Sequence, residues 1–489
     1  MRREVARGWR PYRLEVHGVL VSASALHIGS GQPHVALDAP LLREAGGQAY
    51  IPGASIRGVW NHWLRDECGL LGCTLEAHRR LFGFTPERGA ADAEVAVRGR
   101  LVVEEAYRID EAVSEVRDHV RIDPLTGAAG DGAKFDQEVL AAGARFQFRI
   151  AYEGDGPDDS ELVLLGEALR LLETDGMQVG AKSGQGYGRV RLASTEHRAF
   201  ERDSVAGLAQ WLQARTGPGV WTAGTPVLQA QGRRAGDATG ECRPCSWLTF
   251  DLALHFEGPV LVRSSLPETL RDVSVSAFIK SNNEPYLPGS SLRGILRNRA
   301  RLIANQANQG LVDELFGREL QSDNDKGNRG LIQVFDGRLA DGKRPILVDH
   351  VAIDRILGGA RDGAKFAARP LDSPVFQVCV RVRFRKSEQG ALALWGRLLR
   401  DLVRDAGDLW VGASTSRGYG YLRYVTVNRA VLDLVEEDTG AALAEFADLN
   451  PTLRPGRKIY TLEQPGFAAF SPLWKLAGGA WTTTQGAQI

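Results

Sequence analysis

The sequence predicts an α+β protein that contains two copies of one domain. The first reason is that five short motifs occur twice, in the same order. The second is that apolar residues around each set of motifs alternate in some segments and follow helical spacing in others. The third is the repeat length, which exceeds 200 residues and excludes a solenoid of small units.

The repeated motifs are 231 to 236 residues apart, and this spacing drifts too little for chance matches. The pairs are IPGASIRG at 51–58 with LPGSSLRG at 287–294, LFG at 81–83 and 315–317, DHVRID at 118–123 with DHVAID at 349–354, DGAKF at 131–135 and 362–366, and GAKSGQGYG at 180–188 with GASTSRGYG at 412–420. We conclude that a globular domain was duplicated.

The repeats predict four parts: a first domain at 1–205, a linker at 206–245, a second domain at 246–430 and a C-terminal extension at 431–489. Residues 216–245 are rich in Gly, Pro, Thr and Ala and lack periodicity, which is typical of a linker. In the extension, VLDLVEEDTGAALAEFADLNPTL is expected to form a short helix.

Each copy follows the order strand, helix, strands, helix, strand. The alternating segments lie at 14–29 and 144–154 in the first copy and at 248–262 and 375–386 in the second, and the later helices at 161–174 and 391–403. The PG motif opens the first helix of each copy. This order predicts ferredoxin-like domains, an architecture shared with RNA-recognition modules.

Composition indicates a globular protein without membrane spans. The 489 residues carry 60 Lys or Arg and 60 Asp or Glu, so net charge does not argue for a nucleic-acid partner. No apolar run reaches the ~18 residues that a span needs. Five cysteines do not make a disulfide framework, and the N-terminus does not read as a signal peptide. We expect a cytoplasmic protein.

The start of the first helix in each copy is a candidate phosphate site. Backbone N–H groups point outward at a helix start, and Ser55 or Ser291 is expected to cap it. Arg57 and Arg293 can each add a bidentate phosphate contact. The alternative is that the motif's glycines only allow a tight entry and close packing.

The Gly-rich loop of each copy is a candidate RNA contact. In the first copy Lys182 and Ser183 can meet a phosphate, and Tyr187 can either stack on a base or pack beneath the loop. Arg417 and Tyr419 are the candidates in the second copy. The spacing fits neither a Walker loop nor a dinucleotide fingerprint.

The polar DHV motifs lie in segments expected to project as hairpins, where binding residues are common. The RNA-binding candidates there are His119, Arg121 and His350. Asp118, His119 and Asp123 also suggest a metal or acid–base site. However, the second copy keeps Asp349, His350 and Asp354, and a structural hydrogen-bond network explains the set equally well.

Zinc is a further possibility in the first copy. His62, Cys68, Cys73 and His78 have suitable ligand chemistry. Their spacing is not a strong CxxC pattern, and helix-borne cysteines are often core residues.

Together these motifs resemble the RAMP superfamily, and most of all the backbone subunits that bind guide RNA in type III CRISPR effector complexes. The resemblance rests on LHIGSG, LDAPLLR, IPGASIRG, LFG, the HVRIDPLTGAA…KFDQEVL hairpin and GAKSGQGYG, and covers roughly 14–192 and, more loosely, 247–424. The duplication resembles the fused two-unit backbone proteins of type III-D-like systems. The resemblance implies tandem RAMP domains with thumb hairpins. The partners that it implies are guide RNA, target RNA and other type III subunits.

The resemblance also implies cleavage of target RNA by an aspartate, and Asp38 matches its position. Such an aspartate can deprotonate or orient a 2′-OH for in-line attack, usually with Mg²⁺ or a similar divalent cation. The implied products are a cyclic phosphate and a free 5′-OH. His27 is a second candidate for the scissile region, with a buried, hydrogen-bonded histidine as the alternative.

The second copy departs from the family at this site. Its aspartate position falls near Val275, and IGSG becomes VRSS at 262–265. Asp272 can substitute only if the loop is rearranged, so we expect this copy to bind RNA without cutting it. The segments 118–140 and 349–371 match the thumb, which wedges between guide–target base pairs and bends the target.

Two other functions remain open. One is an architectural RNA-binding filament subunit, in which Asp38 only caps a loop. The other is a ribonuclease that processes the guide precursor, with His27 or His119 as its acid–base centre. A metabolic enzyme that binds a nucleotide at the Gly-rich loop fits the ordered motifs poorly.

Overall fold

The computed structural model describes residues 9–31, 37–86, 96–111, 114–123, 126, 129–217, 219–226, 228, 244–264, 268–270, 273–318, 327–341, 345–405, 408–435, 451–454 and 456–465. They form two compact units, and the units do not coincide with the two repeats. The first unit holds Met1–Ser114, Glu138–Ser183 and Tyr187–Pro244, and the second holds Glu115–Gln137, Gly184–Gly186 and Cys245–Ile489. Most of the first repeat's hairpin therefore belongs with the second repeat.

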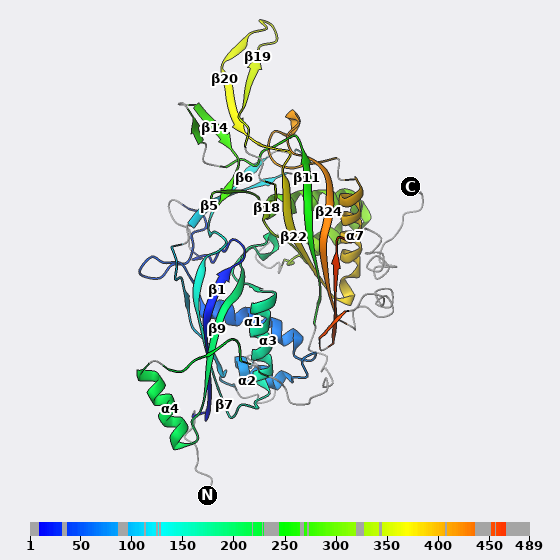
Figure 1. The fold of residues 1–489 in the computed structure, drawn as a ribbon. Helices are drawn as coiled ribbons and strands as arrows, with labels where there is room; N and C mark the ends of the chain where they lie inside the picture. Colours follow the sequence, from blue (N-terminus) through cyan, green and yellow to red (C-terminus); the bar gives the residue numbers. More distant parts are fainter. Residues whose placement is uncertain are drawn as a thin grey trace. The chain divides into compact units, whose positions relative to one another are not determined.

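A ferredoxin-like sheet forms the centre of the first unit. Its main elements are β1 (Tyr12–Ser22), α1 (Gly53–Glu67), β3 (Leu101–Val103), β7 (Arg145–Gly154), α3 (Glu161–Thr174) and β9 (Arg189–Glu201). The sheet order β9-β1-β7-β3 places the fourth strand beside the first, and the third between the first and second. This is the ferredoxin-like arrangement. α1 and α3 lie on one face of the sheet (Figure 1).

The core of this unit follows from helical and strand periodicity. In α1 the buried residues Ile56, Trp60 and Leu64 recur every fourth position, so they form one stripe. The Trp60 ring meets Phe148 of β7 edge to face, with ring centroids 6.0 Å apart. Such packing between helix and sheet provides most of the helix stability.

The first unit contains further short elements, and two of them lie in the predicted linker. The elements are β2 (Tyr50–Ile51), α2 (Leu75–Phe82), β4 (Ala106–Tyr107), β8 (Met177–Gln178), η1 (Ser183–Gln185), which runs into the second unit, α4 (Val205–Thr216) and β10 (Thr222–Ala223). α4 covers the start of the predicted linker at 206–245, and β10 within it extends the sheet beyond β9.

α4 escaped sequence reasoning because it has no buried apolar stripe. Instead Arg202, which follows β9, holds it by cation–π contacts. The Arg202 guanidinium lies 4.9 Å from the Trp211 ring of α4 and 4.6 Å from the Trp9 ring. Hydrophobic periodicity does not reveal a helix attached in this way.

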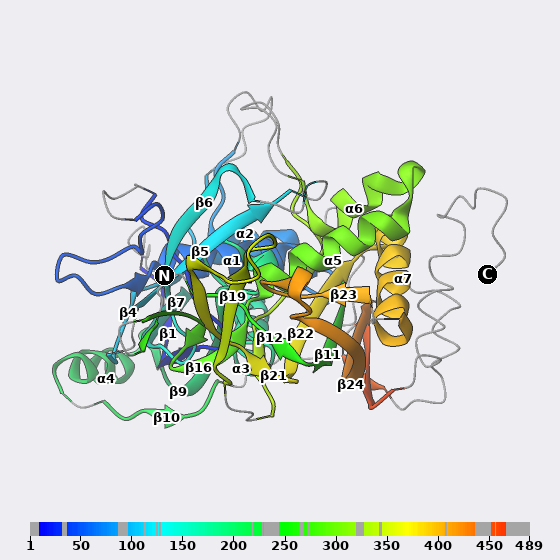
Figure 2. The same cartoon turned by 90° about the horizontal axis from the view of Figure 1, so that it is seen from above.

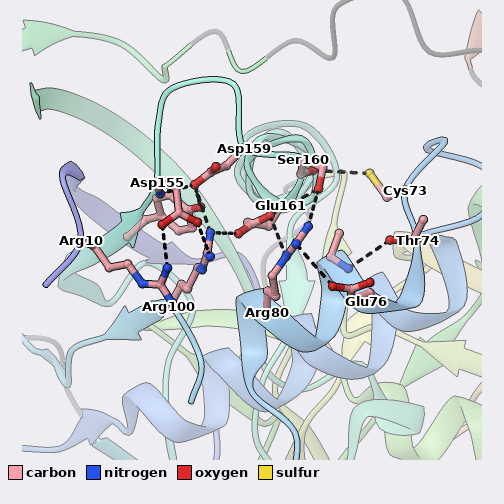
Figure 3. Close-up of polar contacts among 12 residues, drawn as sticks. Arg10, Cys73, Thr74, Glu76, Arg80, Arg100, Asp155, Asp159, Ser160 and Glu161 are labelled. Atoms are coloured by element: carbon pink, nitrogen blue, oxygen red, sulfur yellow. Dashed lines mark hydrogen bonds and ion pairs between the residues drawn. The ribbon is translucent and has the colours of Figure 1, made fainter. Parts of the chain in front are cut away.

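An ion network fixes the start of α3 in the first unit (Figure 3). Arg100 binds Asp155 at 2.6 Å and Asp159 at 3.1 Å, and it also pairs with the buried Glu161. Because Glu161 is buried, removing the arginine would leave its charge poorly paired, so we assign this network to stability rather than to catalysis.

The second unit repeats the same sheet. Its main elements are β11 (Ser246–Glu257), α5 (Gly289–Ala304), β17 (Ile332–Val334), β18 (Gly337–Leu339), β22 (Val375–Phe384), α7 (Gln389–Asp405) and β24 (Tyr421–Val435). β24, β11 and β22 are neighbours, and β17 and β18 both pair with β22. Figure 2 shows α5, α6 (Gln309–Phe316) and α7 grouped together. The predicted α+β, ferredoxin-like fold is confirmed in both repeats.

The second unit also carries elements outside this common plan. They are β12 (Pro259–Val260), β13 (Glu268–Leu270), β14 (Val273–Ala277), β15 (Lys280–Ser281), β16 (Glu284–Leu287), η2 (Gln306–Asn308), β21 (Leu371–Asp372), η3 (Lys386–Glu388), β23 (Leu409–Trp410), η5 (Thr415–Arg417), β25 (Thr452–Arg454) and β26 (Arg457–Glu463).

The C-terminal extension differs from its prediction where it is described. We expected a short helix from Val431 onward, but β24 continues to Val435 and then β26 and β25 extend the sheet. Residues 436–450 lie outside the described residues. None of the helices in the described ranges is long and apolar enough to cross a membrane.

Both predicted hairpins form. In the first repeat β5 (Ser114–Ile122) pairs with β6 (Ala129–Leu140), and in the second β19 (Val348–Ile353) pairs with β20 (Ala360–Arg369). The β19–β20 hairpin extends well beyond the sheet of β11, β22 and β24 (Figure 1).

Candidate active site and RNA interface

Two short stretches of the first repeat run antiparallel and bring the candidate site together. Leu42 N–H donates to Ile28 O at 2.7 Å, and Ser30 N–H donates to Pro40 O at 3.2 Å. The stretch that carries Asp38 is thereby paired with the stretch that carries His27, although the loop between them is only partly described. Asp38 is exposed at this edge.

The backbone of Glu138, at the end of β6, links the two candidates. Its N–H donates to Ala39 O at 3.0 Å, next to Asp38. Its carbonyl accepts from His27 Nδ1 at 2.7 Å. The structure therefore places His27 and Asp38 on either side of one residue that sequence reasoning did not identify.

The Glu138 carboxylate also holds this arrangement. It accepts from Leu41 N–H at 3.0 Å and pairs with Arg43 at 2.5 Å. Burial raises the pKa of Glu138, but these hydrogen bonds and the Arg43 charge outweigh it, so the pKa lies below its usual value. Glu138 is thus ionised at neutral pH and fixes the Asp38-bearing stretch.

His27 is set up as a neutral imidazole. It is 5% exposed, and this burial lowers its pKa. The neutral ring that donates from Nδ1 to the Glu138 carbonyl keeps its lone pair on Nε2. The predicted alternative of a buried, hydrogen-bonded histidine therefore describes its position, and its ring can still accept a proton.

The Gly-rich loop packs against the same stretch. Ala181 N–H donates to His27 O at 3.1 Å, and a Cβ on Gly180 would lie 2.3 Å from that oxygen. The loop turns at Lys182, which has φ +57°. Burial lowers the pKa of Lys182 to about 8, and its charge acts on His27. The site thus combines a carboxylate, an imidazole and an ammonium group.

The carboxylates of this site can be compared with the ligands that the expected divalent cation needs. The Glu138 carboxylate is bound to Leu41 and Arg43, and Asp38 is exposed to solvent. No group of three or more His, Cys, Asp or Glu side chains in the described part of the chain is arranged to hold a metal. Mg²⁺ is often bound by one or two carboxylates together with substrate phosphates, so Asp38 fits a cation brought with RNA.

The second repeat has the same backbone arrangement. Ile279 N–H donates to Val262 O at 2.8 Å, and Ser264 N–H donates to Ala277 O at 3.0 Å. These bonds are equivalent to Leu42–Ile28 and Ser30–Pro40, and they fix which residues of the repeats correspond.

The side chains at this second site are different. When the two repeats are matched through these hydrogen bonds, Val275 stands in the place of Asp38, as expected, and Leu261 stands in the place of His27. Arg369 stands where the first repeat has Glu138, because the paired Val260 and Leu371 correspond to Leu26 and Leu140. Asp272 lies outside the described residues. The described part of this site has no acid–base pair.

Carboxylates occupy the helix starts that we considered for phosphate. Gly53 N–H donates to Glu105 at 2.8 Å, and Gly289 N–H donates to Asp336 at 2.8 Å. The residues at the N-cap positions are Pro52 and Pro288, and the cap comes from these two acids, so the expectation that Ser55 or Ser291 caps the helix is wrong.

The two arginines of these helices have matching contacts. Arg57 donates to the Phe82 carbonyl and Arg293 to the Phe316 carbonyl, and each guanidinium lies over the ring of that phenylalanine. Each arginine thus ties the first helix of its repeat to the LFG turn. This favours the packing alternative, and RNA contacts by Arg57, Arg293, Ser55 and Ser291 stay predictions.

Tyr187 takes the second of its two predicted positions, and Tyr419, which was predicted to contact RNA, is buried in the same way. Tyr187 and Tyr419 are 2% and 4% exposed, so their rings pack beneath the loops rather than offering a face to a base. Tyr419 also hydrogen-bonds His350 Nε2 at 2.9 Å.

An aromatic and cationic cluster lies at the base of the second hairpin. His350 stacks on Phe366 with centroids 4.9 Å apart, and the Arg417 guanidinium lies 4.9 Å from the same ring. Phe366 and Arg417 are exposed, which suits stacking and phosphate contacts. In the first hairpin His119 stacks on Phe135 in the same way, at 4.9 Å.

The hairpin aspartates have structural partners. Asp118 lies 3.8 Å from Lys134, and Asp349 lies 3.4 Å from Lys365 on the opposite strand. Asp123 accepts from Thr126 N–H, and Asp354 accepts from the N–H groups of Ile356 and Leu357. These contacts support the structural explanation of the motif. Arg121 is exposed and stays an RNA-binding prediction, as does Ser183 of the Gly-rich loop.

The zinc candidates do not come together. Cys73 Sγ lies 3.7 Å from Ser160 O (Figure 3), and His78 Nε2 lies 2.9 Å from Asn61 O. Cys68 is buried in the core and contacts the carbonyl of Arg65. These contacts give the zinc hypothesis no support.

Sequence reasoning missed Glu138, Arg43, Glu105 and Asp336. Glu105 and Asp336 lie 231 residues apart, at the offset of the hairpin motifs, so this pair of acids could have been found by extending the repeat alignment. Glu138 had no such signal, because the second repeat has arginine there.

Comparisons with known proteins agree with the duplication. A model of the RAMP superfamily matches residues 20–191 and 254–423. The chain is also similar to two proteins named CRISPR system Cms endoribonuclease Csm3. The one from Methanocaldococcus jannaschii is 24% identical over 198 residues, covering 36% of this chain and 77% of that protein. The one from Methanothermobacter thermautotrophicus is 25% identical over 210 residues, covering 37% and 84%. Since the two family matches span more than half of the chain, this protein belongs to the RAMP superfamily and carries two of its domains in tandem.

Proposed function

We propose that this chain is a guide-RNA-binding backbone subunit of a type III CRISPR ribonucleoprotein, and that it cleaves complementary target RNA at one centre in the first repeat. The observation that carries the proposal is the difference between the repeats. In the first repeat Glu138 bonds to His27 and to Ala39, the residue after Asp38. In the second repeat Leu261 and Val275 stand in the places of His27 and Asp38. The printed names of the similar proteins, which describe CRISPR endoribonucleases, support the same activity.

Asp38 is the group that contacts the reacting atoms in this proposal. Its exposed carboxylate accepts or orients the proton of a target 2′-OH, and O2′ then attacks the adjacent phosphorus. The P–O5′ bond breaks, which leaves a 2′,3′-cyclic phosphate and a 5′ oxygen that takes up a proton. A divalent cation, when bound by Asp38 and RNA phosphates, would stabilise the charge that develops on the phosphate.

The other residues of the site hold its backbone in place and give it a positive charge. His27 is largely buried, so it acts as a positioning residue that ties its stretch to Glu138. Lys182 is mostly protonated at pH 7, since its pKa of about 8 lies above that value. Its positive charge favours a nearby RNA phosphate. The cluster of His350, Phe366 and Arg417 offers the second repeat a way to bind RNA without cleaving it.

The proposal is tested by mapping cuts in labelled complementary RNA with the assembled ribonucleoprotein and Mg²⁺. Asp38→Asn keeps the size of the side chain and removes its charge, so we expect one cut to slow by about 10²–10⁴-fold while target binding persists. Asp158→Asn, at an exposed aspartate before α3, is the matched control and should cut like wild type. If Asp38→Asn also cuts at the wild-type rate, the subunit is architectural.

A further inference from the structure

Four aromatic side chains lie together on the sheet of the second unit. Trp410 of β23 stands opposite Tyr421 of β24, with ring centroids 5.2 Å apart. Tyr424 of β24 stands opposite His255 of β11, and these two rings are stacked, with centroids 4.3 Å apart and ring planes at 16°. The four rings form one aromatic patch across β23, β24 and β11.

This aromatic patch lies on the face of the sheet that points away from the core. Leu422 and Val425 of β24 belong to the hydrophobic core of the second unit, together with residues of α5 and α7. A bulge in β24 separates them, where the pairing with β11 shifts its register. The bulge lets both Tyr421 and Tyr424 point to the opposite face.

The aromatic patch is open to solvent. The side chains of Trp410 and Tyr424 are 41% and 44% exposed. Farther along the same face, Thr426 and Gln377 both pair with Ala253 of β11, and both are exposed. The rings are therefore accessible to a ligand, and the side chains beside them are polar.

The first repeat has the same strand positions without the rings. Its paired residues at these positions are Val21 with Arg191 and Gln178 with Arg189, which correspond to His255 with Tyr424 and Trp410 with Tyr421. Since both repeats fold the same sheet, the fold itself does not require aromatic residues here. The aromatic patch is a property of the second repeat.

The chemistry of this face favours RNA with unpaired bases. Accessible rings stack on bases, and RNA-recognition modules, which share this architecture, stack two or three bases on the same face of their sheet. Arg423 pairs with Glu257 at 3.7 Å, but a pair between exposed side chains is weak, so this cation can also meet a phosphate. The core of a protein interface is more apolar than a face that carries Thr426 and Gln377. The exposed Arg191 of the first repeat suits the phosphates of the same kind of ligand.

We propose that the aromatic patch of the second repeat stacks unpaired bases of the target RNA, outside the stretch that pairs with the guide. Bases within a duplex stack on their neighbours, so a paired strand has no free base faces to offer. In the proposed cleavage reaction the guide is paired, and a target longer than the guide brings unpaired bases of its own. The inference rests on the proposed function for the source of this RNA, but it involves none of the cleavage residues.

The first test follows the tryptophan fluorescence of the full chain as short single-stranded RNA is added. Stacked bases quench an indole, so we expect part of the quenching to disappear in Trp410→Phe, and in wild type when the RNA is a duplex or lacks bases. Trp9→Phe is the matched control, because Trp9 is 40% exposed and belongs to the first unit. Tyr424→Ala should raise the RNA concentration at the midpoint about 10-fold, whereas Tyr424→Phe keeps the ring and should not.

Two results of this test would overturn the proposal, once melting curves show that each variant is folded. One is a Trp410→Phe protein that is quenched as strongly as wild type, since bases would then not reach the aromatic patch. The other is equal quenching by duplex RNA, since unpaired bases would then not be what the patch recognises.

A second test identifies the strand in the assembled ribonucleoprotein. Target RNAs are made with 2′-deoxy residues in the guide-paired stretch, which prevents attack by a 2′-OH, and carry an unpaired extension at one end, at the other end or at neither. We expect one extension to tighten binding about 10-fold in wild type and to have no effect in Tyr424→Ala. If neither extension tightens binding in wild type, the target does not supply the bases and the proposal fails.

The outcome of this test is separate from that of the proposed function. With an ordinary RNA target, Tyr424→Ala should cut at the wild-type position and, at saturating protein, at the wild-type rate. A failure of the cleavage proposal appears as unchanged cuts in Asp38→Asn, whereas a failure of the present one appears as an unchanged effect of the extension in Tyr424→Ala.

Discussion

Glu138 joins the two halves of the candidate active site with both its backbone and its carboxylate. Its backbone holds His27 and Ala39, and its carboxylate holds Leu41 and Arg43. Glu138→Gln leaves the backbone bonds but removes the charge that pairs with Arg43. We expect cleavage to slow about 10-fold, with little change in target affinity, because Asp38 is held less firmly. Single-turnover rates and binding isotherms separate these effects.

Glu138→Gln should also lower the stability of the fold in a way that depends on pH. The pKa of Glu138 is lowered in the folded state, so its ionisation stabilises the fold above the usual value of 4.5, and this contribution is lost as the pH falls through the folded pKa. Wild type should be more stable than Glu138→Gln by about 1 kcal/mol at pH 7, and the difference should shrink below pH ~4. Denaturant unfolding measures the free energy of unfolding of both proteins. If the difference between them stays constant across this pH range, the effect comes from the shape of the side chain rather than from its charge.

Individual residues show where sequence reasoning reaches its limit. Asp38 could be proposed from the sequence because it lies in a motif. Glu138 could not, because it is 111 residues from His27 and 97 from Leu41, and such contacts arise only when β6 returns to the site. The helix-start arginines illustrate the opposite case, since a motif retained in both repeats serves packing against Phe82 and Phe316.

Within a single element, the start of α1 contains two glycines, Gly53 and Gly58, whose surroundings differ. A Cβ on Gly53 would lie 2.2 Å from Val103 O, whereas a Cβ on Gly58 would meet nothing within 4 Å. Gly53→Ala should therefore destabilise the protein by about 1–3 kcal/mol, because backbone must move. Gly58→Ala should be neutral or stabilise by up to ~1 kcal/mol, because alanine favours a helix. Unfolding curves of both variants measure this, and equal effects would contradict the close approach.

Elements with strong periodicity were predictable and the others were not. α3 runs over 161–174, as its apolar spacing predicts, and the β1 and β11 strands follow from alternation. α4 has no buried residue and is attached through Arg202, so no apolar pattern marks it. The strands of the extension were missed because VLDLV fits a strand or a helix equally well, and its pairing with β11 and β26 decides.

At the scale of the whole molecule, the duplication predicts one cut per chain. Val275 is 1% exposed, unlike the exposed Asp38 that it replaces. Val275→Asp should therefore not create a second cut, because Leu261 and Arg369 still stand where the first site has His27 and Glu138. It should instead destabilise the second unit by about 1–3 kcal/mol through a buried carboxylate. A new cut mapped in the assembled complex would show that the aspartate alone is sufficient.

The path of the chain between the two units has a consequence for synthesis and proteolysis. Because 115–137 packs with the second unit, the first hairpin leaves the ribosome long before its partner Asp336 exists. Until then Arg117 lacks Asp336 and the ring of Tyr286, so a nascent first repeat should expose this segment to proteases and chaperones.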